Sequence, residues 1–151
     1  MCHRAIYGSI FLQRLERRRA PRIIEKGEHT SKMSEYSDLI INLARQVWSE
    51  LGPGYSERVY HNAMEVMLRN AGVRYETERI IPISFRGHVI GNLRADIVVD
   101  NRLIVELKAI KTLKEDNKVQ AKRYIELTGL PCTLLINFPQ PCGDAEFFLV
   151  E

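Results

Sequence analysis

Cysteine and long apolar runs are scarce in this sequence, and each shortage excludes a class of protein. The three cysteines, Cys2, Cys132 and Cys142, are an odd number without a C-x-x-C pair, which argues against a disulfide framework and a zinc finger. The longest uncharged stretch, residues 128–143, contains three prolines. No segment therefore reaches the roughly 18 apolar residues of a membrane-spanning helix. We expect a reduced, cytoplasmic protein with no membrane partner.

An excess of one charge is also missing from most of the chain. The 151 residues are 45% hydrophobic and 27% charged, enough for one compact domain with a real core. The formal net charge of +3 is unevenly placed, because residues 1–32 contain eight basic and three acidic residues, a net +5. Residues 33–151 carry 14 basic and 16 acidic residues, a net −2. Any general attraction to a polyanion thus belongs to the first segment.

Residues 1–32 form an N-terminal extension of different composition, with an arginine cluster at residues 17–19. It could be a basic arm that binds nucleic acid, or an organelle presequence, although three glutamates and the lack of a clear cleavage pattern weaken the second option. The remaining alternative is a disordered leader, or an upstream start codon with Met33 as the working initiator. We expect residues 33–151 to form the folded domain.

The first half of that domain predicts two helices. Apolar residues recur at helical spacing over residues 39–48, after Ser37 as a plausible N-cap, and residues 51–54 end this helix. A second helix begins near Ser56 and stops at Gly72.

The second half predicts strands and one more helix. Three antiparallel strands, residues 75–85, 89–99 and 103–109, are joined by turns at 86–88 and 100–101. Residues 112–115 have the form of a capping box with Thr112 as N-cap, which predicts a helix over 113–127 ending at Gly129. Strands follow at 133–138 and 146–150. The order α-α-β-β-β-α-β-β indicates a mixed α/β or α+β domain with helices flanking one sheet.

Charged residues interrupt the apolar strands at three positions. Glu106 and Lys108 are two apart and so project from the same face of their strand. Asp96 lies on the strand joined to theirs by the 100–101 turn, where it can be a cross-strand or diagonal neighbour. Two carboxylates and an ammonium group are thereby brought into one small volume.

Burial of such a cluster costs several kcal/mol unless the charges are compensated. One interpretation is a salt bridge between Lys108 and either acid on a strand edge. The other is a divalent cation, Mg²⁺ or Mn²⁺, held by Asp96, Glu106 and the backbone carbonyl of Leu107. Such an ion polarises a phosphodiester and lowers the pKa of a bound water. Lys108 would then orient the water and offset the charge that develops on phosphorus oxygens.

The complete pattern resembles a known group of enzymes. Asp96 followed by Glu106-Leu107-Lys108 on the next strand is similar to the motif of the PD-(D/E)xK nuclease superfamily. The segment Gly54-Tyr55-Ser56-Glu57-Arg58-Val59-Tyr60 matches the signature of the small GxxExxY family, which is generally placed in that superfamily. With residues 51–54 and 134–138, the resemblance covers about residues 36–150. Ala95 stands where the name-giving proline would be, and Tyr55-Ser56 replace more usual apolar residues.

This resemblance implies an α-β-β-β-α-β nuclease core and a role for each matching residue. Asp96 and Glu106 correspond to the metal-binding acids and Lys108 to the catalytic lysine. Glu57 corresponds to an acid that reaches the metal site or its water. Gln120 and Tyr124 look like the Gln-x-x-x-Tyr element that lines the active site of RecB-like members, and their spacing puts them on one helix face.

Several of these residues also have ordinary structural interpretations. Glu57 is an acid in the first turn of a helix, where the helix dipole favours it. Gln120 could be a solvated surface amide. Two histidines, His61 and His88, have no partner at zinc-binding spacing and are interpreted as surface or turn residues. Core positions are expected for Trp48, Tyr60 and Cys132.

The leading functional hypothesis is a Mg²⁺- or Mn²⁺-dependent nuclease that acts through a metal-activated water, with DNA favoured as the substrate and RNA as the alternative. The alternative is a non-catalytic module that binds nucleic acid or protein and retains the nuclease fold. We also expect a homodimer or a protein partner, which would help this small domain to hold a duplex. Basic residues near the site form either a phosphate track or a solvated helix face. They are Lys111, Lys114, Lys118 and Lys122, with Arg94 and Arg123.

Overall fold

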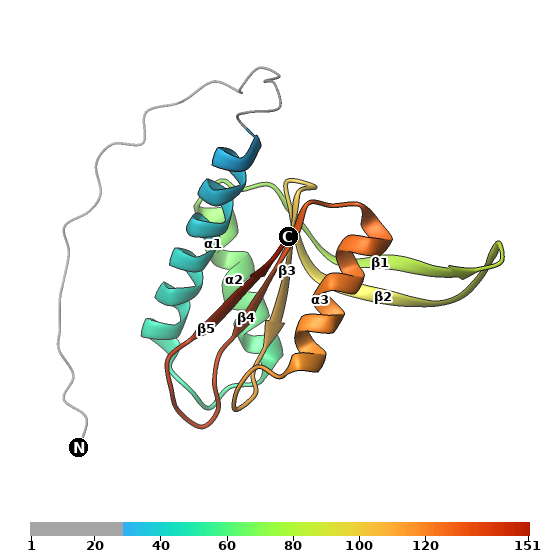
Figure 1. The fold of residues 1–151 in the computed structure, drawn as a ribbon. Helices are drawn as coiled ribbons and strands as arrows, with labels where there is room; N and C mark the ends of the chain where they lie inside the picture. The colour runs from blue at the N-terminus through green and yellow to red at the C-terminus, as the bar shows by residue number, and fades with distance from the viewer. Residues whose placement is uncertain (1–28) are drawn as a thin grey trace, which may run out of the picture.

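The computed structural model describes residues 29–151, which form three helices and five strands (Figure 1). None of these helices is long and apolar enough to cross a membrane. The predicted order of elements and the α+β class are confirmed. In chain order the elements are α1 (His29–Leu51), α2 (Glu57–Asn70), β1 (Tyr75–Phe85), β2 (His88–Val99), β3 (Leu103–Lys108), α3 (Glu115–Thr128), β4 (Cys132–Asn137) and β5 (Glu146–Val150).

The five strands form one mixed sheet in the order β1-β2-β3-β4-β5. The pairs β1–β2, β2–β3 and β4–β5 are antiparallel, so the predicted meander is confirmed, whereas β3 and β4 are parallel. A parallel pair needs a crossover connection, and α3 supplies it. The turns of the meander have the left-handed backbone of tight hairpins, with φ of 48° and 53° at Asp100 and Asn101 and 48° and 80° at Arg86 and Gly87.

Helices cover both faces of the sheet (Figure 1). The helices α1 and α2 pack on one face, where the buried cluster includes Tyr60, Val105 and Leu107. On the other face, α3 packs through Tyr124 against Ile104. Successive residues of β3 therefore alternate between two apolar layers. Glu106 and Lys108 follow Ile104 by two and four residues on β3, so they lie on the face that α3 covers.

The start of α1 differs from the prediction. The helix begins at His29, and Ser37, predicted as its N-cap, lies inside it with only 4% of its surface exposed. A single serine costs a helix only a few tenths of a kcal/mol, so it does not have to mark a terminus. The predicted domain start at residue 33 therefore falls within α1, and residues 1–28 of the predicted extension lie outside the described residues.

The start of α3 also differs, because the predicted capping box does not form. The N-cap is Lys114, whose backbone N–H donates to the side-chain oxygen of Asn117 at 2.9 Å. Thr112 instead donates its hydroxyl to a carboxylate oxygen of Glu146 at 2.6 Å. The competing acceptor comes from β5, more than thirty residues away in the chain. The predicted end at Gly129 is confirmed, with φ of 69°.

Glu146 ties the loop before α3 to the sheet. Its carboxylate accepts hydrogen bonds from the hydroxyl of Thr112, the backbone N–H of Leu113 at 3.0 Å and the amide of Asn137 at 2.6 Å. Burial alone would raise the pKa of Glu146, but these three donors together lower it below the ordinary value. The ionised carboxylate is therefore part of what holds the folded state together.

We expect Glu146→Gln to lower the free energy of unfolding by about 1–3 kcal/mol at pH 7, since one charged acceptor oxygen becomes a donor that faces other donors. A carboxyl whose pKa is lowered by folding stabilises above its unfolded pKa, and this contribution disappears as the pH falls through the folded pKa. Urea unfolding at several pH values should thus show the variant and the parent converging in acid. Glu126→Gln, at an exposed position on α3, is the matched control. A difference that is constant with pH would contradict the assignment.

The sheet splits on its β2 side. The pairing of β2 with β3 covers three residue pairs and ends at Ile97 and Val105. Before that point β2 pairs with β1 alone, so the two strands leave the sheet as a ribbon that projects beyond α3 (Figure 1). The place where β2 departs from β3 is called the fork below.

Candidate active site

The fork is where the predicted carboxylates meet. Asp96 is the first residue of β2 beyond the last β2–β3 pair. Its Oδ2 accepts a hydrogen bond of 2.8 Å from the backbone N–H of Leu107. The N–H and C=O of one strand residue point to the same side of the strand, so the carbonyl of Leu107 also faces the fork. Asp96 thus replaces the strand partner that Leu107 lacks.

Glu106 and Lys108 form an ion pair next to this contact. The ammonium nitrogen of Lys108 lies 2.8 Å from Oε1 of Glu106, and the two side chains are only 16% and 4% exposed. The second carboxylate oxygen of Glu106, Oε2, is buried and has no hydrogen-bond partner. A buried unpaired oxygen on a charged group is costly, so the predicted salt bridge exists but does not satisfy the cluster.

The closeness of these groups shifts their pKa values. Burial raises the pKa of Glu106, and the charge of Asp96 raises it further, although Lys108 opposes both effects. Burial alone would lower the pKa of Lys108, but the neighbouring carboxylates of Glu106, Glu57 and Asp96 raise it on balance. The lysine therefore stays protonated, while Glu106 resists ionisation in the absence of a further cation.

The face of α3 that carries Gln120 and Tyr124 covers the cluster. The hydroxyl of Tyr124 donates its single proton to the backbone carbonyl of Arg94 at 2.8 Å and lies close to the carboxylate of Glu106. Burial and then the charge of Glu106 raise the pKa of Tyr124 well above its ordinary range, whereas a hydrogen bond with Gln120 acts in the opposite direction. Both residues are therefore brought to the site, and Tyr124 remains a hydrogen-bond donor.

Glu57, the first residue of α2, reaches the same cluster from the other side. Partial burial raises the pKa of its carboxyl, and the charge of Asp96 raises it further. Lys108, the backbone N–H of Ala109 and His61 oppose this shift. These influences come from the end of β3 and from β2, so Glu57 lies near the cluster, and its role there stays a prediction.

The position of Glu57 depends on the loop before α2. Gly54, with φ of 107°, donates its N–H to Oε1 of Gln140 at 2.7 Å. The amide of Gln140 donates to the hydroxyl of Tyr60 at 2.9 Å, and that hydroxyl donates to the carbonyl of Gly52 at 2.7 Å. The chain of bonds, called the Gln140 clamp below, holds both ends of the loop against α2. As predicted, Tyr60 is a core residue and is fully buried.

Two residues of the site were missed by the sequence analysis. His61 was interpreted as a surface residue, which is wrong, because it is 5% exposed and its Nε2 lies 3.2 Å from the carbonyl oxygen of Asp96. Its Nδ1 lies 3.5 Å from a carboxylate oxygen of Glu65. The spacing of Glu57, His61 and Glu65 on one helix face was the available signal. Gln140 had no signal, because its partners in the clamp, Gly54 and Tyr60, are more than 75 residues away in sequence.

The lysines of the predicted phosphate track lie on α3 and in the loop before it. Lys118 lies 4.6 Å from the centre of the Phe148 ring on β5 and 3.4 Å from a carboxylate oxygen of Glu115. Within residues 29–151, no hydrogen bond or ion pair connects Lys111, Lys114, Lys118 or Lys122 with the acids of the fork. A role for these lysines in binding nucleic acid stays a prediction.

The donor set of the fork suits a hard divalent cation. It offers the carboxylates of Asp96 and Glu106 and the carbonyl of Leu107, all oxygen, and Mg²⁺ is typically held by one or two carboxylates with water completing its shell. The unpaired Oε2 of Glu106 is the observation that fits best, since a cation would satisfy it. The part of the chain that the structure describes has no cluster of three or more His, Cys, Asp or Glu side chains fit to hold a metal.

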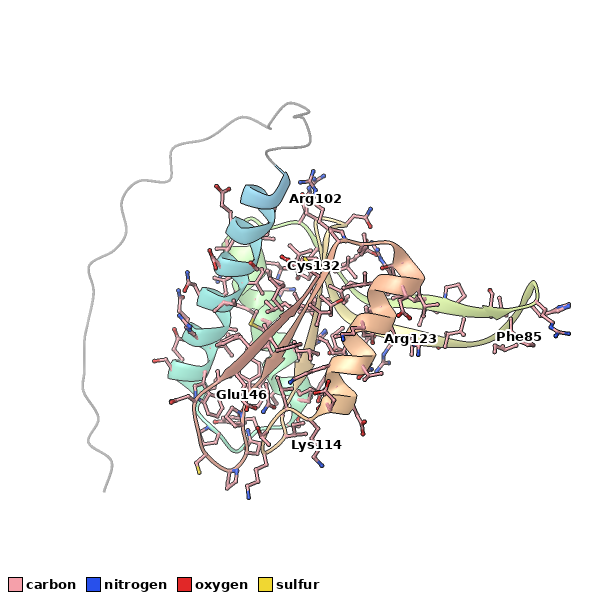
Figure 2. All side chains as sticks on the ribbon, viewed as in Figure 1. Phe85, Arg102, Lys114, Arg123, Cys132 and Glu146 are labelled. Carbon is pink, nitrogen blue, oxygen red and sulfur yellow. The ribbon has the colours of Figure 1, made fainter. Side chains whose placement is uncertain are left out.

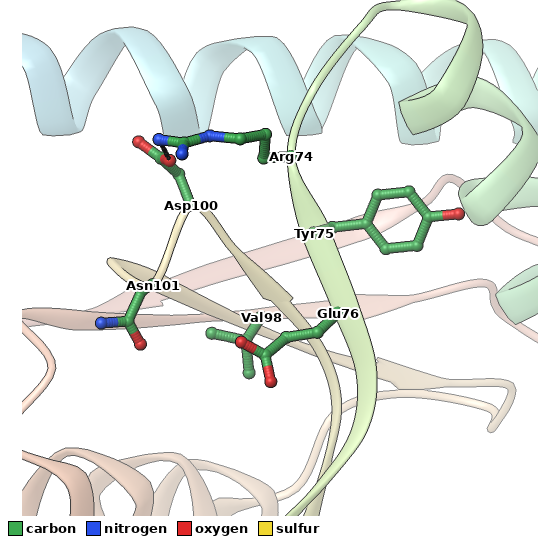
Figure 3. A pocket seen from close by; sticks show the side chains of 6 residues that line it. All are labelled: Arg74, Tyr75, Glu76, Val98, Asp100 and Asn101. Carbon is green, nitrogen blue, oxygen red and sulfur yellow. Dashed lines mark hydrogen bonds and ion pairs between the residues drawn. The ribbon is translucent and has the colours of Figure 1, made fainter.

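A concave feature lies away from the fork. It is a hollow of about 270 Å³ lined by Arg74, Tyr75, Glu76, Val98, Asp100 and Asn101 (Figure 3). Arg74 and Asp100 form an ion pair across it. The hollow therefore contains none of the residues that make up the carboxylate cluster.

Comparison with known proteins supports the fold and the family. The model of the PD-(D/E)XK nuclease superfamily matches residues 34–147. A solved structure titled "Crystal structure of SSO0001" is 21% identical, with a TM-score of 0.50 over 82% of this chain. At 21% identity the likeness concerns the fold alone, and the matched region spans 61% of that protein. The search of curated proteins finds no match.

Proposed function

This chain belongs to the PD-(D/E)XK nuclease superfamily, and we propose that it hydrolyses phosphodiester bonds of DNA with the help of Mg²⁺ or Mn²⁺. The observation that carries the proposal is the unpaired, buried Oε2 of Glu106 beside Asp96 and Lys108. A cluster with one oxygen unsatisfied is costly in a folded protein, and catalytic sites are where such costs are found.

Asp96, Glu106 and the carbonyl of Leu107 would hold the ion. When bound, it would supply polarisation of the phosphodiester and a lower pKa for a coordinated water. The Leu107 N–H contributes by fixing the carboxylate of Asp96 through a 2.8 Å hydrogen bond. His61, next to the carbonyl of Asp96, supports the same residue from the α2 side.

Lys108 and Glu57 would act on the substrate and its water. The Lys108 ammonium, kept protonated by its carboxylate neighbours, stabilises negative charge that develops on the phosphate oxygens. Glu57 has a raised pKa, which makes its carboxylate a better proton acceptor near neutral pH. Tyr124 and Gln120 line the remaining side and keep polar groups directed at the cluster.

We also propose that the segment 54–60 marks the GxxExxY family within the superfamily. Each of its three defining residues has a separate structural role, which supports this proposal. Gly54 adopts a backbone conformation that favours glycine and bonds to Gln140, Glu57 approaches the carboxylates, and Tyr60 fixes the loop between them.

The test is cleavage of nucleic acid by the full chain. We expect cleavage of plasmid or linear DNA with Mg²⁺ or Mn²⁺, none with EDTA, and loss in Lys108→Ala. Single-stranded, double-stranded and branched DNA, with RNA of the same sequences, would define the preferred substrate. Arg69→Ala, which removes an exposed cation on α2, is the matched control and should remain active.

Absence of cleavage with either metal on every substrate would refute the proposal. Binding of nucleic acid without any cleavage would then identify a non-catalytic module. Equal activity of Lys108→Ala and the parent would refute the assignment of the lysine.

A further inference from the structure

The ribbon formed by β1 and β2 exposes large apolar side chains that no other element covers. Its outer part, residues 80–94, is called the arm and extends beyond α3, with Phe85 at its far end (Figure 2). Ile80, Phe85, Val89 and Ile90 are 59–68% exposed. Near the base of the arm, Ile81 instead packs under Tyr124 of α3. The exposed residues thus form an unpartnered surface on a projecting element.

The arm also carries charge of one sign. Residues 80–94 include Arg86, His88 and Arg94 and contain no Asp or Glu. The guanidinium of Arg86 lies 5.4 Å from the centre of the Phe85 ring, and within the described residues it has no carboxylate partner. Residues 33–151 as a whole are net −2, so the arm is locally basic on an otherwise acidic domain. This local positive charge is complementary to a polyanionic partner.

The base of the arm is part of the site. Arg94 precedes Asp96 by two residues on β2, and its carbonyl accepts the hydroxyl proton of Tyr124 at 2.8 Å. The side chain of Arg94 is 61% exposed. A ligand that extends from the fork along the arm would therefore meet Arg94 first and the tip at Phe85 and Arg86 last.

We propose that the arm enters the major groove of double-stranded DNA and holds the duplex while one strand lies at the fork. The inference rests on the proposed function and deepens it. The major groove of B-form DNA admits a two-stranded β-ribbon, arginine contacts phosphates or guanine edges there, and apolar side chains contact thymine methyl groups. The major groove of A-form RNA is too narrow for side chains to read.

Binding is measured without cleavage by using the full chain with Lys108→Ala in Mg²⁺. The probe is a fluorescein-labelled duplex of about 30 base pairs, followed by anisotropy over a range of salt concentrations. We expect Phe85→Ala with Arg86→Ala to weaken binding by about tenfold and to lower the slope of log K against log salt by about one. Arg102→Ala, which changes a partly exposed arginine away from the arm (Figure 2), should change neither quantity.

Thermal unfolding of each variant checks the fold, and Arg86→Ala alone serves if the double variant is unstable. Unchanged affinity and salt slope in the arm variants would overturn the proposal, as would equal dependence on the arm for an RNA duplex. A dimer that the arm variants dissociate, with DNA binding intact, would also overturn it. A cleavage assay of the parent separates the two proposals. If binding depends on the arm but the parent does not cleave DNA, only the nuclease activity is refuted. If the parent cleaves DNA but binding does not depend on the arm, only the proposal for the arm is refuted.

Discussion

Glu106→Gln is expected to abolish hydrolysis and, in EDTA, to make the fold more stable. Glutamine has the shape of glutamate but no negative charge, so a principal anionic ligand is lost and we expect activity to fall by about 10³-fold or more. The ionised form of Glu106 is disfavoured by burial and by Asp96, and Oε2 is unpaired. Burial and Asp96 outweigh the ion pair with Lys108 in setting the pKa of Glu106, so removal of this charge should raise the free energy of unfolding at pH 7 by about 1 kcal/mol.

Two measurements check this expectation. Cleavage rates give the activity, and thermal unfolding with EDTA and with millimolar Mg²⁺ gives the stability. Mg²⁺ should stabilise the parent and leave the variant unchanged, since an ion stabilises only the state that binds it. Glu126→Gln on α3 is the control for removal of an exposed carboxylate. A variant that is both active and no more stable than the parent would contradict the role of Glu106.

Tyr60→Ala is expected to have the largest effect on stability, about 3–5 kcal/mol. The ring is fully buried, lies 4.5 Å from the Phe138 ring in a stacked arrangement and contacts Trp48. A cavity at this position would open the core between α1, α2 and β4. Urea unfolding would measure the loss, and Tyr55→Ala, at an exposed ring, should cost far less.

Tyr60→Phe tests the Gln140 clamp while it leaves the packing of the core in place. The ring stays, but the hydroxyl that bonds to Gly52 and Gln140 is removed. We expect a loss of activity of about 10–100-fold at a small cost in stability, as is typical when a support of an active-site residue is removed. Gln140→Ala should reproduce the effect through the same loop. Full activity in both variants would show that Glu57 does not depend on the clamp.

The sequence predicts the strands and turns well because their signals are local. The pair Asp100-Asn101 tolerates the left-handed backbone of a tight hairpin, and the apolar residues on either side fix its register. The carboxylate cluster follows from the same register, since the turn brings Asp96 opposite the end of β3. Strand periodicity and one turn were sufficient for both inferences.

The remaining features could not be predicted because they depend on partners far away in the chain. Thr112 looks like a cap until the carboxylate of Glu146 on β5 takes its hydroxyl. The burial of His61 depends on how α2 crosses β2, which periodicity does not specify. Lys118 turns toward Phe148, whose strand pairs with β4 at the far side of the sheet. The departure of the arm from the sheet is likewise a property of the assembled strands.

The fork has a consequence for how this lineage can evolve. Asparagine at position 96 would keep an oxygen that accepts the N–H of Leu107 while it removes the negative charge. Aspartate and asparagine codons differ by a single base. The hydrogen bond that closes the gap in the sheet can therefore survive a mutation that removes the proposed chemistry, so the fold at this point does not depend on that chemistry.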